Sequence, residues 1–221
     1  GIFPNIFLSK DLPSHALISG LPTETQTSLE VEGILSPLFS VNGRPLVIKS
    51  DNGYGFISKE TRAFLEKQRV LLLLSPGHQP DYNGGAESGV GTLKAYAHYI
   101  ARREGRAGAW SCDDIEQARV LANECARPFG IGGGSPREHF ERRVEVSETE
   151  REVFLATYRS YEIMARKQRG VPERGGLDPW VQASIDREAI TRALVALGFL
   201  VIQGRANCPP IIPENLAGIA Q

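Results

Sequence analysis

Residues 45–53 read PLVIKSDNG, an apolar run that ends in Asp-Asn-Gly. A nearly continuous apolar run bounded by turn residues is typical of a strand buried on both faces. A second such run, VLLLLS at 70–75, follows an amphipathic stretch at 58–69 that predicts a short helix. Two buried strands on either side of a helix favour an α/β layer. Asp51 then stands at the carboxyl end of the first strand.

The sequence before this strand predicts a β-hairpin and a helix. Apolar runs at 2–10 and 15–21 are separated by a turn cluster, which is typical of a hairpin. We expect Thr23 or Thr25 to cap a helix that ends at Asn42-Gly43. Its expected apolar face consists of Leu29, Ile34, Leu35 and Leu38.

The sequence after the second strand changes from loop to helix. Residues 75–85, SPGHQPDYNGG, are turn residues throughout, as expected of a mobile loop. Helical patterns then cover 86–104, 112–126, 147–170 and 186–198, and FLVIQ at 199–203 is a candidate terminal strand. Ser-x-x-Asp and Ser-x-x-Glu boxes at Ser111 and Ser147 predict two of the helix starts. We therefore expect an α/β layer followed by a mainly helical region.

The composition is that of an ordinary soluble globular protein. Of 221 residues, 41% are hydrophobic and 23% charged, and the formal net charge is -1, so any surface for DNA must be a local patch. The three cysteines cannot all pair, which favours a reduced compartment and argues against a zinc site. We assign them and Trp180 to packing. No long apolar run or signal segment is present, so we expect a cytoplasmic protein with no membrane partner.

Two isolated carboxylates, Asp51 and Glu87, are candidate metal ligands. Positions 52 to 86, which are 35 residues, separate them, and Glu87 opens the helical pattern that begins at Ala86. A carboxylate at the end of a strand and another on a later helix are how oxygen-ligand metal sites form at a sheet edge. Magnesium suits such a pair because it prefers oxygen ligands and keeps room for water and phosphate oxygens.

Helical phase places cations beside Glu87. At about 100° per residue, one stripe of the 86–104 helix holds Glu87, Gly91, Lys94, His98 and Arg102, and the opposite stripe holds Leu93, Tyr96, Ala97 and Ile100. Taken alone, Asp-Asn-Gly is a turn signal and a charged stripe is a solvated helix face. Taken together, they favour a metal site next to a phosphate backbone.

These motifs resemble the DDE transposases and retroviral-type integrases, whose catalytic core is RNase H-like. PLVIKSDNGYGF (45–56) looks like the family's second-aspartate motif, and SPGHQPDYNGGAES (75–88) looks like its flexible loop and glutamate helix. Lys94 matches the DNA-contacting lysine of the family. Residues 11–25, 110–130 and 135–143, and more weakly 187–200, resemble other parts of the bacterial insertion-element transposases.

The resemblance implies a mixed sheet in the order 3-2-1-4-5, flanked by helices, with a third ligand on the central first strand. That aspartate is not found between Gly1 and Asp51, because Asp11 is too close to Asp51 and matches a hairpin turn. We therefore expect a sequence truncated at its N-terminus, without the first strand, and inactive by itself. The expected domains are an integrase core at 1–143 and a helical extension at 144–221.

The resemblance also implies the chemistry. Two Mg²⁺ (or Mn²⁺) ions would lie between the missing Asp, Asp51 and Glu87, and would support nicking of mobile-element ends and their joining to target DNA. Tyr82 and Asn83 would position DNA, unless they only form a turn. The expected partners of this polynucleotidyl transferase are DNA and further copies of the chain, with the protein nucleoid-associated when bound to DNA.

Two alternatives remain open at the level of sequence. One is a DNA-binding or assembly remnant of a transposase that cuts nothing. The other is an RNase H-like nuclease that hydrolyses DNA without joining it.

Overall fold

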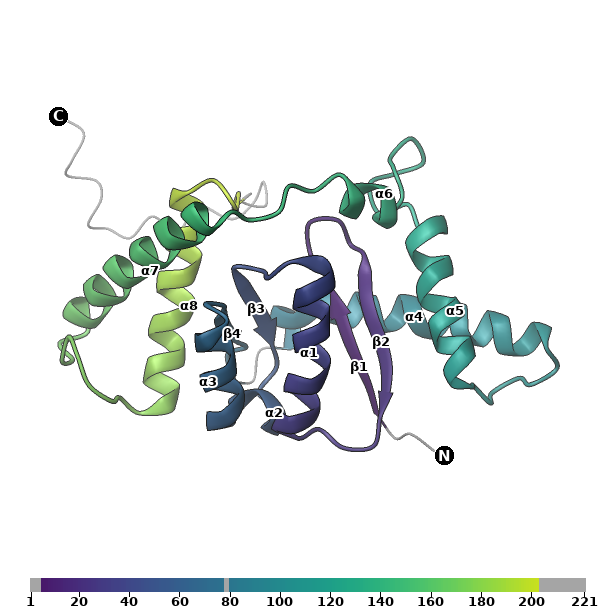
Figure 1. Ribbon diagram of the computed structural model, residues 1–221, viewed down its shortest axis with the longest axis horizontal. Helices are drawn as coiled ribbons and strands as arrows, with labels where there is room; N and C mark the ends of the chain where they lie inside the picture. The colour runs from purple at the N-terminus through teal and green to yellow at the C-terminus, as the bar shows by residue number, and fades with distance from the viewer. Residues whose placement is uncertain (1–4, 78–79, 203–221) are drawn as a thin grey trace.

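The structure is a computed structural model that describes residues 5–77 and 80–202 of the chain. Figure 1 shows the elements, coloured along the chain, with helices around a small strand layer. They are β1 (Asn5–Lys10), β2 (Leu17–Thr23), α1 (Ser28–Asn42), β3 (Val47–Ser50), α2 (Tyr54–Ile57), α3 (Lys59–Lys67), β4 (Leu71–Leu74), the 3-10 turn η1 (Pro80–Asn83), α4 (Gly84–Arg103), α5 (Cys112–Cys125), α6 (Pro136–Glu141), α7 (Glu148–Gln168) and α8 (Pro179–Ala196).

The strands form two separate pairs within the described residues. β1 runs antiparallel to β2, with Leu8 opposite Gly20, and β3 runs parallel to β4, with Ser50 opposite Leu74. The four strands predicted before residue 76 are present. They form two pairs and not one continuous sheet, because no hydrogen bonds join β1 to β3 in the described part of the chain; the missing central strand stays a prediction. β1, and not β2, lies on the side nearer β3 (Figure 1). Each of these two strands therefore has one edge without a partner strand there.

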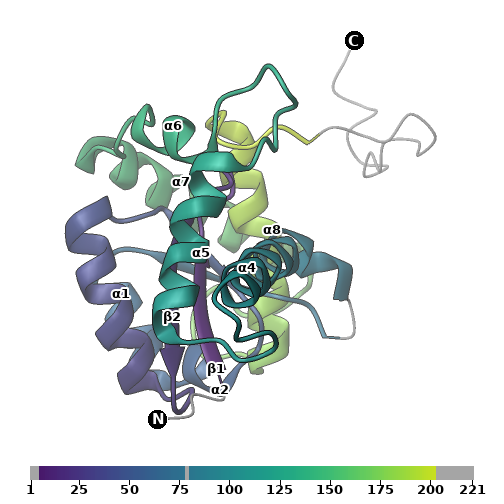
Figure 2. The same cartoon turned by 90° about the vertical axis from the view of Figure 1, so that its right-hand side faces the viewer.

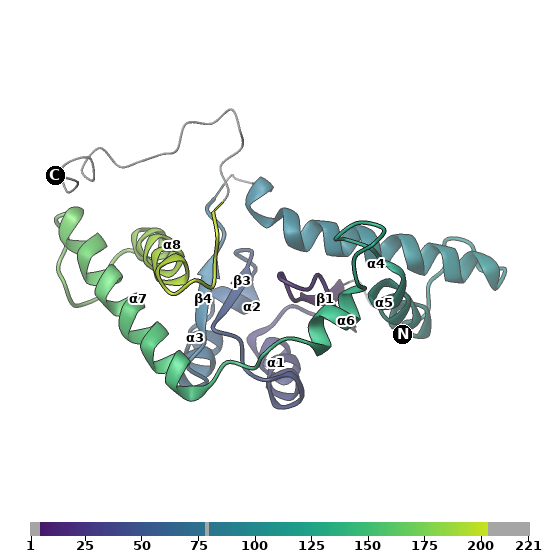
Figure 3. The same ribbon diagram turned by 90° about the horizontal axis from the view of Figure 1, so that it is seen from above.

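Successive side chains of each strand point to opposite faces of the strand layer, and helices pack on both faces. Phe7, Ile48 and Leu72 pack on one face in a single apolar cluster with α1 and α3, so both strand pairs share one core. Their neighbours in sequence point to the opposite face, where Leu8 packs in the α4–α5 cluster, and Val47 and Leu71 pack in the α7–α8 cluster. Figure 3 shows α1 and α3 on one side of the strands and α4 and α8 on the other.

The predicted start of α1 is wrong by two to four residues. Thr27 caps the helix in a reciprocal capping box with Glu30, instead of Thr23 or Thr25. The predicted face is also wrong, because Leu29 is 80% exposed. The buried residues of α1 are Val31, Leu35 and Phe39, and of the predicted face only Leu35 is among them.

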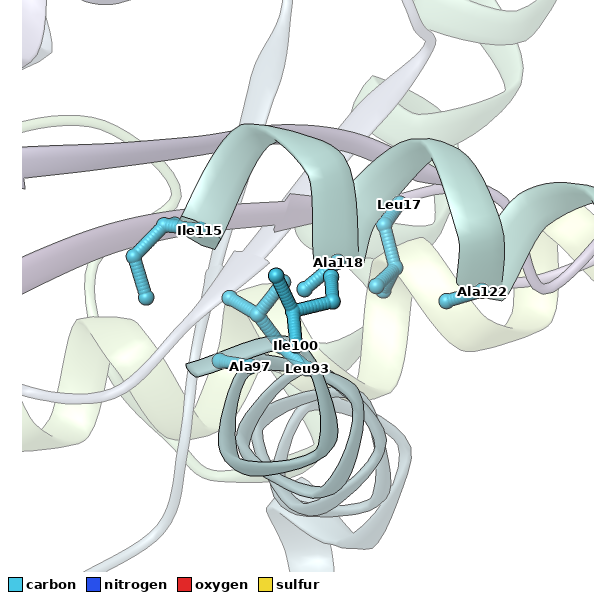
Figure 4. Packing of buried hydrophobic residues seen from close by; sticks show 7 residues of the cluster. All are labelled: Leu17, Leu93, Ala97, Ile100, Ile115, Ala118 and Ala122. Carbon is cyan, nitrogen blue, oxygen red and sulfur yellow. The ribbon is translucent and has the colours of Figure 1, made fainter. Parts of the chain in front are cut away.

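The side of α4 that was predicted to be apolar is buried against α5 and β2. Figure 4 shows this cluster, which consists of Leu17, Leu93, Ala97, Ile100, Ile115, Ala118 and Ala122. α5 lies against both β2 and α4 (Figure 2). Gly89 lets α4 approach β1, because a Cβ there would lie 3.1 Å from Lys10 Cδ and 3.2 Å from Leu8 Cδ2.

The α7–α8 pair packs directly on β3 and β4. Phe154 and Ala193 are fully buried with Leu46, next to Val47 and Leu71. α7 therefore packs on the strand layer through its buried face. α8 begins at Pro179, seven residues before the predicted start at 186 (186 − 179), because the Asp178 carboxylate accepts a hydrogen bond from Trp180 N at 2.9 Å and caps the helix.

Several smaller predictions can be compared with the structure. The capping boxes at Ser111 and Ser147 are confirmed. Trp180 is 63% exposed, and Cys112 and Cys125 are exposed, so their assignment to packing is wrong; Cys208 lies outside the described residues. The described part of the predicted terminal strand, 199–202, is not a strand. No helix in 5–77 or 80–202 has the length and hydropathy needed to cross a membrane.

Candidate active site and nucleic-acid interface

The carboxyl ends of β3 and β4 meet the start of α4 at Ser75. Ser75 N donates to Ser50 O at 3.0 Å, and Ser75 Oγ lies 2.9 Å from the same oxygen and 2.8 Å from Asn83 Oδ1. Asn52 Nδ2 donates to Ser75 O at 3.0 Å. Asp51 lies between Ser50 and Asn52, and Asn83 directly precedes α4. One serine therefore brings the segment of Asp51 and the start of α4 to the same edge of the strand layer.

Asp51 is exposed where the chain leaves β3. Its Oδ1 accepts a hydrogen bond from Gly53 N at 3.0 Å, which closes the turn into α2. Its Oδ2 has no hydrogen-bond partner within the described residues. The turn interpretation and the ligand interpretation of Asp-Asn-Gly are thus compatible, because the turn uses one oxygen and leaves the other open.

Glu87 is exposed in the first turn of α4. A helix N-terminus favours a carboxylate in its first turn. Glu87 forms no ion pair with the residues that the structure describes. Among those residues no cluster of three or more His, Cys, Asp or Glu side chains could hold a metal ion. Asp51 and Glu87 therefore do not belong to a cluster of three or more such side chains in the described ranges.

Two cations contact Tyr82 and the end of β4. Lys49 Nζ donates to Tyr82 O and lies 4.0 Å from the centre of the Tyr82 ring. Arg187 of α8 donates from Nη1 to Leu74 O at 3.2 Å, and its charge acts on Tyr82. Burial lowers the pKa of Lys49 and raises the pKa of Tyr82. The predicted loop residues Tyr82 and Asn83 are therefore fixed to β3 and β4 in this structure.

The predicted exposed stripe of α4 is confirmed as a surface. Glu87, Gly91, Lys94, His98 and Arg102 are all exposed, whereas Leu93, Ala97 and Ile100 are buried and Tyr96 is half-buried. Lys94 and Arg102 form no ion pair with other described residues. Contact of the stripe with DNA stays a prediction.

His98 differs from the two other basic residues of the stripe. Its Nδ1 accepts a hydrogen bond from Trp110 Nε1 at 3.2 Å, and the two rings meet edge to face at 4.6 Å. The imidazole is therefore oriented by the segment after α4. The His98 side chain is therefore less free than those of Lys94 and Arg102 to change its conformation toward a DNA phosphate.

Sequence reasoning missed Lys49, Ser75 and Arg187. Lys49 carried a signal, since it is the one charge inside the apolar run of residues 45–50. Ser75 closes the second apolar run but resembles any loop serine. Arg187 had no local signal, because its contact with Leu74 joins positions 113 residues apart.

No protein-family model matches the sequence, and no curated protein matches it. Solved structures do match the fold. A chain of the cryo-EM structure of the simian T-cell lymphotropic virus intasome in complex with PP2A regulatory subunit B56 gamma has a TM-score of 0.54 and 18% identity, over 65% of this chain and 55% of that chain. The match therefore spans little more than half the length of that neighbour.

Two catalytic core domains also match. The HTLV-2 integrase core, solved with magnesium in a dimeric form, has a TM-score of 0.50 and 20% identity, over 61% of this chain and 83% of that chain. The core of BIV integrase has a TM-score of 0.51 and 20% identity, over 62% and 84%. The chain therefore has the fold of a retroviral integrase catalytic core, which is RNase H-like.

Proposed function

We propose that this chain is part of a polynucleotidyl transferase that nicks the ends of a mobile DNA element and joins them to target DNA. The observation that carries the proposal is the link through Ser75, which brings the Asp51 segment and the helix of Glu87 to one edge of an integrase-type fold. The neighbours add support, because one is an integrase core solved with magnesium and another belongs to an intasome.

The donor chemistry of Asp51 and Glu87 fits magnesium or manganese. Both side chains are exposed carboxylates, and Asp51 keeps an oxygen open. Magnesium in phosphoryl-transfer sites is commonly held by one or two carboxylates together with water and phosphate oxygens. When bound, such ions lower the pKa of the attacking hydroxyl or water and stabilise the leaving oxygen of the scissile phosphate. A site for two ions needs one more carboxylate.

We place the third carboxylate on a strand between β1 and β3. Each of these strands has one edge without a strand partner in the described residues, and both pack on the same α1–α3 core. A strand inserted there would form hydrogen bonds with the unpaired edges of both β1 and β3. It would complete the family's sheet order 3-2-1-4-5, which the resemblance implies. Asp11 does not take this role, because its carboxylate accepts hydrogen bonds from Ser14 in the hairpin turn.

The remaining site residues act on the DNA. Lys94 and Arg102, exposed along α4 in line with Glu87, bind backbone phosphates. His98 contributes from its fixed position against Trp110. Tyr82 and Asn83 shape the segment beside the scissile bond. Because both ends of an element are joined in one reaction, the protein acts as a homo-oligomer on DNA.

A strand-transfer assay tests the proposal. The protein from the complete coding sequence is incubated in Mg²⁺ with a pre-nicked element end and plasmid DNA. We expect joined product, with a loss of at least about 100-fold for Asp51→Asn or Glu87→Gln, since each removes a ligand. Lys59→Ala, an exposed charge change on α3, is the matched control and should stay active.

The same assay separates the alternatives. Hydrolysis of the nicked end without any joined product would support a nuclease. DNA binding with neither product would support a non-catalytic remnant of a transposase.

A further inference from the structure

A cavity of about 290 Å³ lies beside the Glu87 helix, between the β1–β2 turn, the first half of α4 and the end of α5. Its polar lining is basic or neutral, and no carboxylate lines it. The polar side chains are Lys10, His15, Ser88, Thr92, Asn123 and Arg127.

The cations of this cavity have no acidic partner in the described residues. Lys10 Nζ donates to Gly85 O at 3.1 Å and lies 3.2 Å from Ser88 Oγ, and both acceptors are neutral. Arg127 uses Nη1 on the main-chain oxygens of Glu124 and Ala126, at 2.7 and 2.8 Å, and its other nitrogens donate no hydrogen bond to the described residues. Two positive groups therefore face one cavity with donors to spare.

His15 is fixed at the mouth of the cavity in an uncommon backbone conformation. Its φ is 62°, a region that residues other than glycine rarely adopt. The turn around it is closed by Asp11 N donating to Ala16 O at 2.8 Å, and the His15 ring meets Phe129 edge to face at 5.3 Å. The imidazole is thus held between the hairpin and the segment after α5.

The charges around His15 oppose one another. Burial and the Lys10 charge lower the pKa of His15, and Asp11 raises it. Burial also lowers the pKa of Lys10. On the other side of the cavity, Arg127 lies close enough to Glu138 to lower its pKa. A bound anion would remove the repulsion between Lys10 and His15, and would raise the pKa of both groups.

The cavity adjoins the candidate active site through α4. Ser88, which lines it, directly follows Glu87, and consecutive helical residues are rotated by about 100°. The volume is at the lower limit of small-molecule pockets, about 300 Å³. It suits one phosphate with its sugar better than a whole cofactor.

We propose that this cavity, which we call the Lys10–Arg127 pocket, binds one backbone phosphate of a nucleic-acid strand whose neighbouring phosphates lie at Glu87 and Lys94. The proposal rests on the proposed function and extends the DNA surface from the exposed stripe of α4 to the hairpin turn. Lys10 and Arg127 supply charge, and Ser88, Thr92 and Asn123 surround the phosphate with uncharged polar groups.

Two measurements on the whole chain test the pocket. In the first, side-chain NMR follows the four histidines through a pH titration, alone, with inorganic phosphate, and with a short DNA duplex. We expect the DNA to raise the pKa of His15, and phosphate to do so at higher concentration.

In the second measurement, fluorescence anisotropy reports DNA affinity between about 50 and 200 mM salt. Arg127→Gln and Lys10→Gln should each weaken binding several-fold and reduce the slope of log affinity against log salt by about one. Arg127→Lys should restore most of the loss. Lys67→Ala, which removes an exposed charge from α3, should change the affinity little. Arg127 is exposed, so its variants keep the fold even where Lys10→Gln does not.

The outcomes separate this inference from the proposed function. If Lys94→Ala weakens DNA binding while Arg127→Gln binds like the wild type and His15 is insensitive to DNA, the pocket is refuted and the function stands. If phosphate shifts His15 but no DNA binds, the pocket serves a free anion, and both the phosphate-backbone assignment and the proposed function fail.

Discussion

Arg151 is the residue that fixes α7 to the strand layer. Its side chain is 1% exposed, and its guanidinium donates to Arg44 O at 2.6 Å, Pro45 O at 2.8 Å and Arg69 O at 3.2 Å. These oxygens lie just before β3 and just after α3. A single helical side chain thereby satisfies three main-chain acceptors.

Arg151→Met should destabilise the protein by about 3 kcal/mol, because it keeps the side-chain volume and removes three charge-assisted hydrogen bonds. Urea denaturation measures the loss. Arg159→Met on the exposed side of the same helix should change the free energy of unfolding by less than about 0.5 kcal/mol. Equal effects of the two substitutions would contradict the anchoring role of Arg151.

Asp114 and Asp186 should respond to the same substitution with opposite signs. The Arg106 guanidinium and Ser111 N hold the pKa of Asp114 well below its ordinary value, whereas burial raises the pKa of Asp186. A lowered pKa contributes stability that is present above the unfolded pKa of about 3.9 and is lost as the pH falls. A raised pKa contributes stability only at low pH, which is lost as the pH rises through the folded pKa.

At neutral pH, Asp114→Asn should therefore lower the urea midpoint and Asp186→Asn should raise it. The amide introduced by Asp186→Asn would retain an acceptor for Tyr158 Oη and Gln182 Nε2, which donate to Asp186 Oδ1 at 2.8 and 2.7 Å. The Asp186→Asn difference should shrink as the pH falls below the raised pKa of Asp186, and the Asp114→Asn difference only below about pH 3.9, where the unfolded state binds a proton that the folded Asp114 does not. A lower midpoint for both variants at pH 7 would show that the charge of Asp186 is stabilising.

At the scale of elements, the segment between β4 and α4 depends on Lys49. Its ammonium holds Tyr82 through the main-chain oxygen and the ring face. Lys49→Met should release this segment while the strand stays buried, because methionine keeps the apolar stem. Hydrogen exchange of the Tyr82 and Asn83 amides should become faster, and the amides of β4 should stay protected.

Lys67→Met at the exposed end of α3 is the matched control for this experiment. Unchanged exchange at Tyr82 and Asn83 in Lys49→Met would show that Ser75 and Arg187 hold the segment without Lys49.

Helices and strands could be predicted from the sequence where a local pattern of residues determines the structure. The exposed and buried sides of α4 follow from a period of 3.6 residues, and the capping boxes at Ser111 and Ser147 are local signals. The start of α1 was misplaced because Thr23, Thr25 and Thr27 are all suitable caps, and Glu30 selects the last of them. Asp51 and Glu87 could be named as candidates because their motifs are local, but no local pattern indicates that Ser75 links their segments.

At the scale of the whole molecule, α7 and α8 complete the core of β3 and β4. The sequence predicted a boundary at 143/144, and the structure shows Leu46, Val47 and Leu71 covered by residues beyond that boundary. Such packing depends on contacts between positions about a hundred residues apart, for which a single sequence carries no direct signal.

A chain that ends at residue 143 should therefore expose the α7–α8 face of β3 and β4 and aggregate, or melt well below the whole chain. Calorimetry and size-exclusion chromatography compare the two. The whole chain should unfold in one transition. A soluble 1–143 chain with an unchanged melting temperature would establish 144–221 as an independent extension.

The division of the strand layer also bears on the order of folding. The β1–β2 hairpin is local and can form within microseconds, whereas the parallel β3–β4 pair must wait for the α2–α3 crossover. With no ladder between the pairs in the described residues, docking onto the α1–α3 cluster is the step that unites them. Phe7 of β1 stacks on Phe56 of α2, with 5.9 Å between the ring centroids. We expect this contact to form only in the late docking step of refolding. The two halves of the layer would thus mature as separate units and become cooperative only when α1 closes over both.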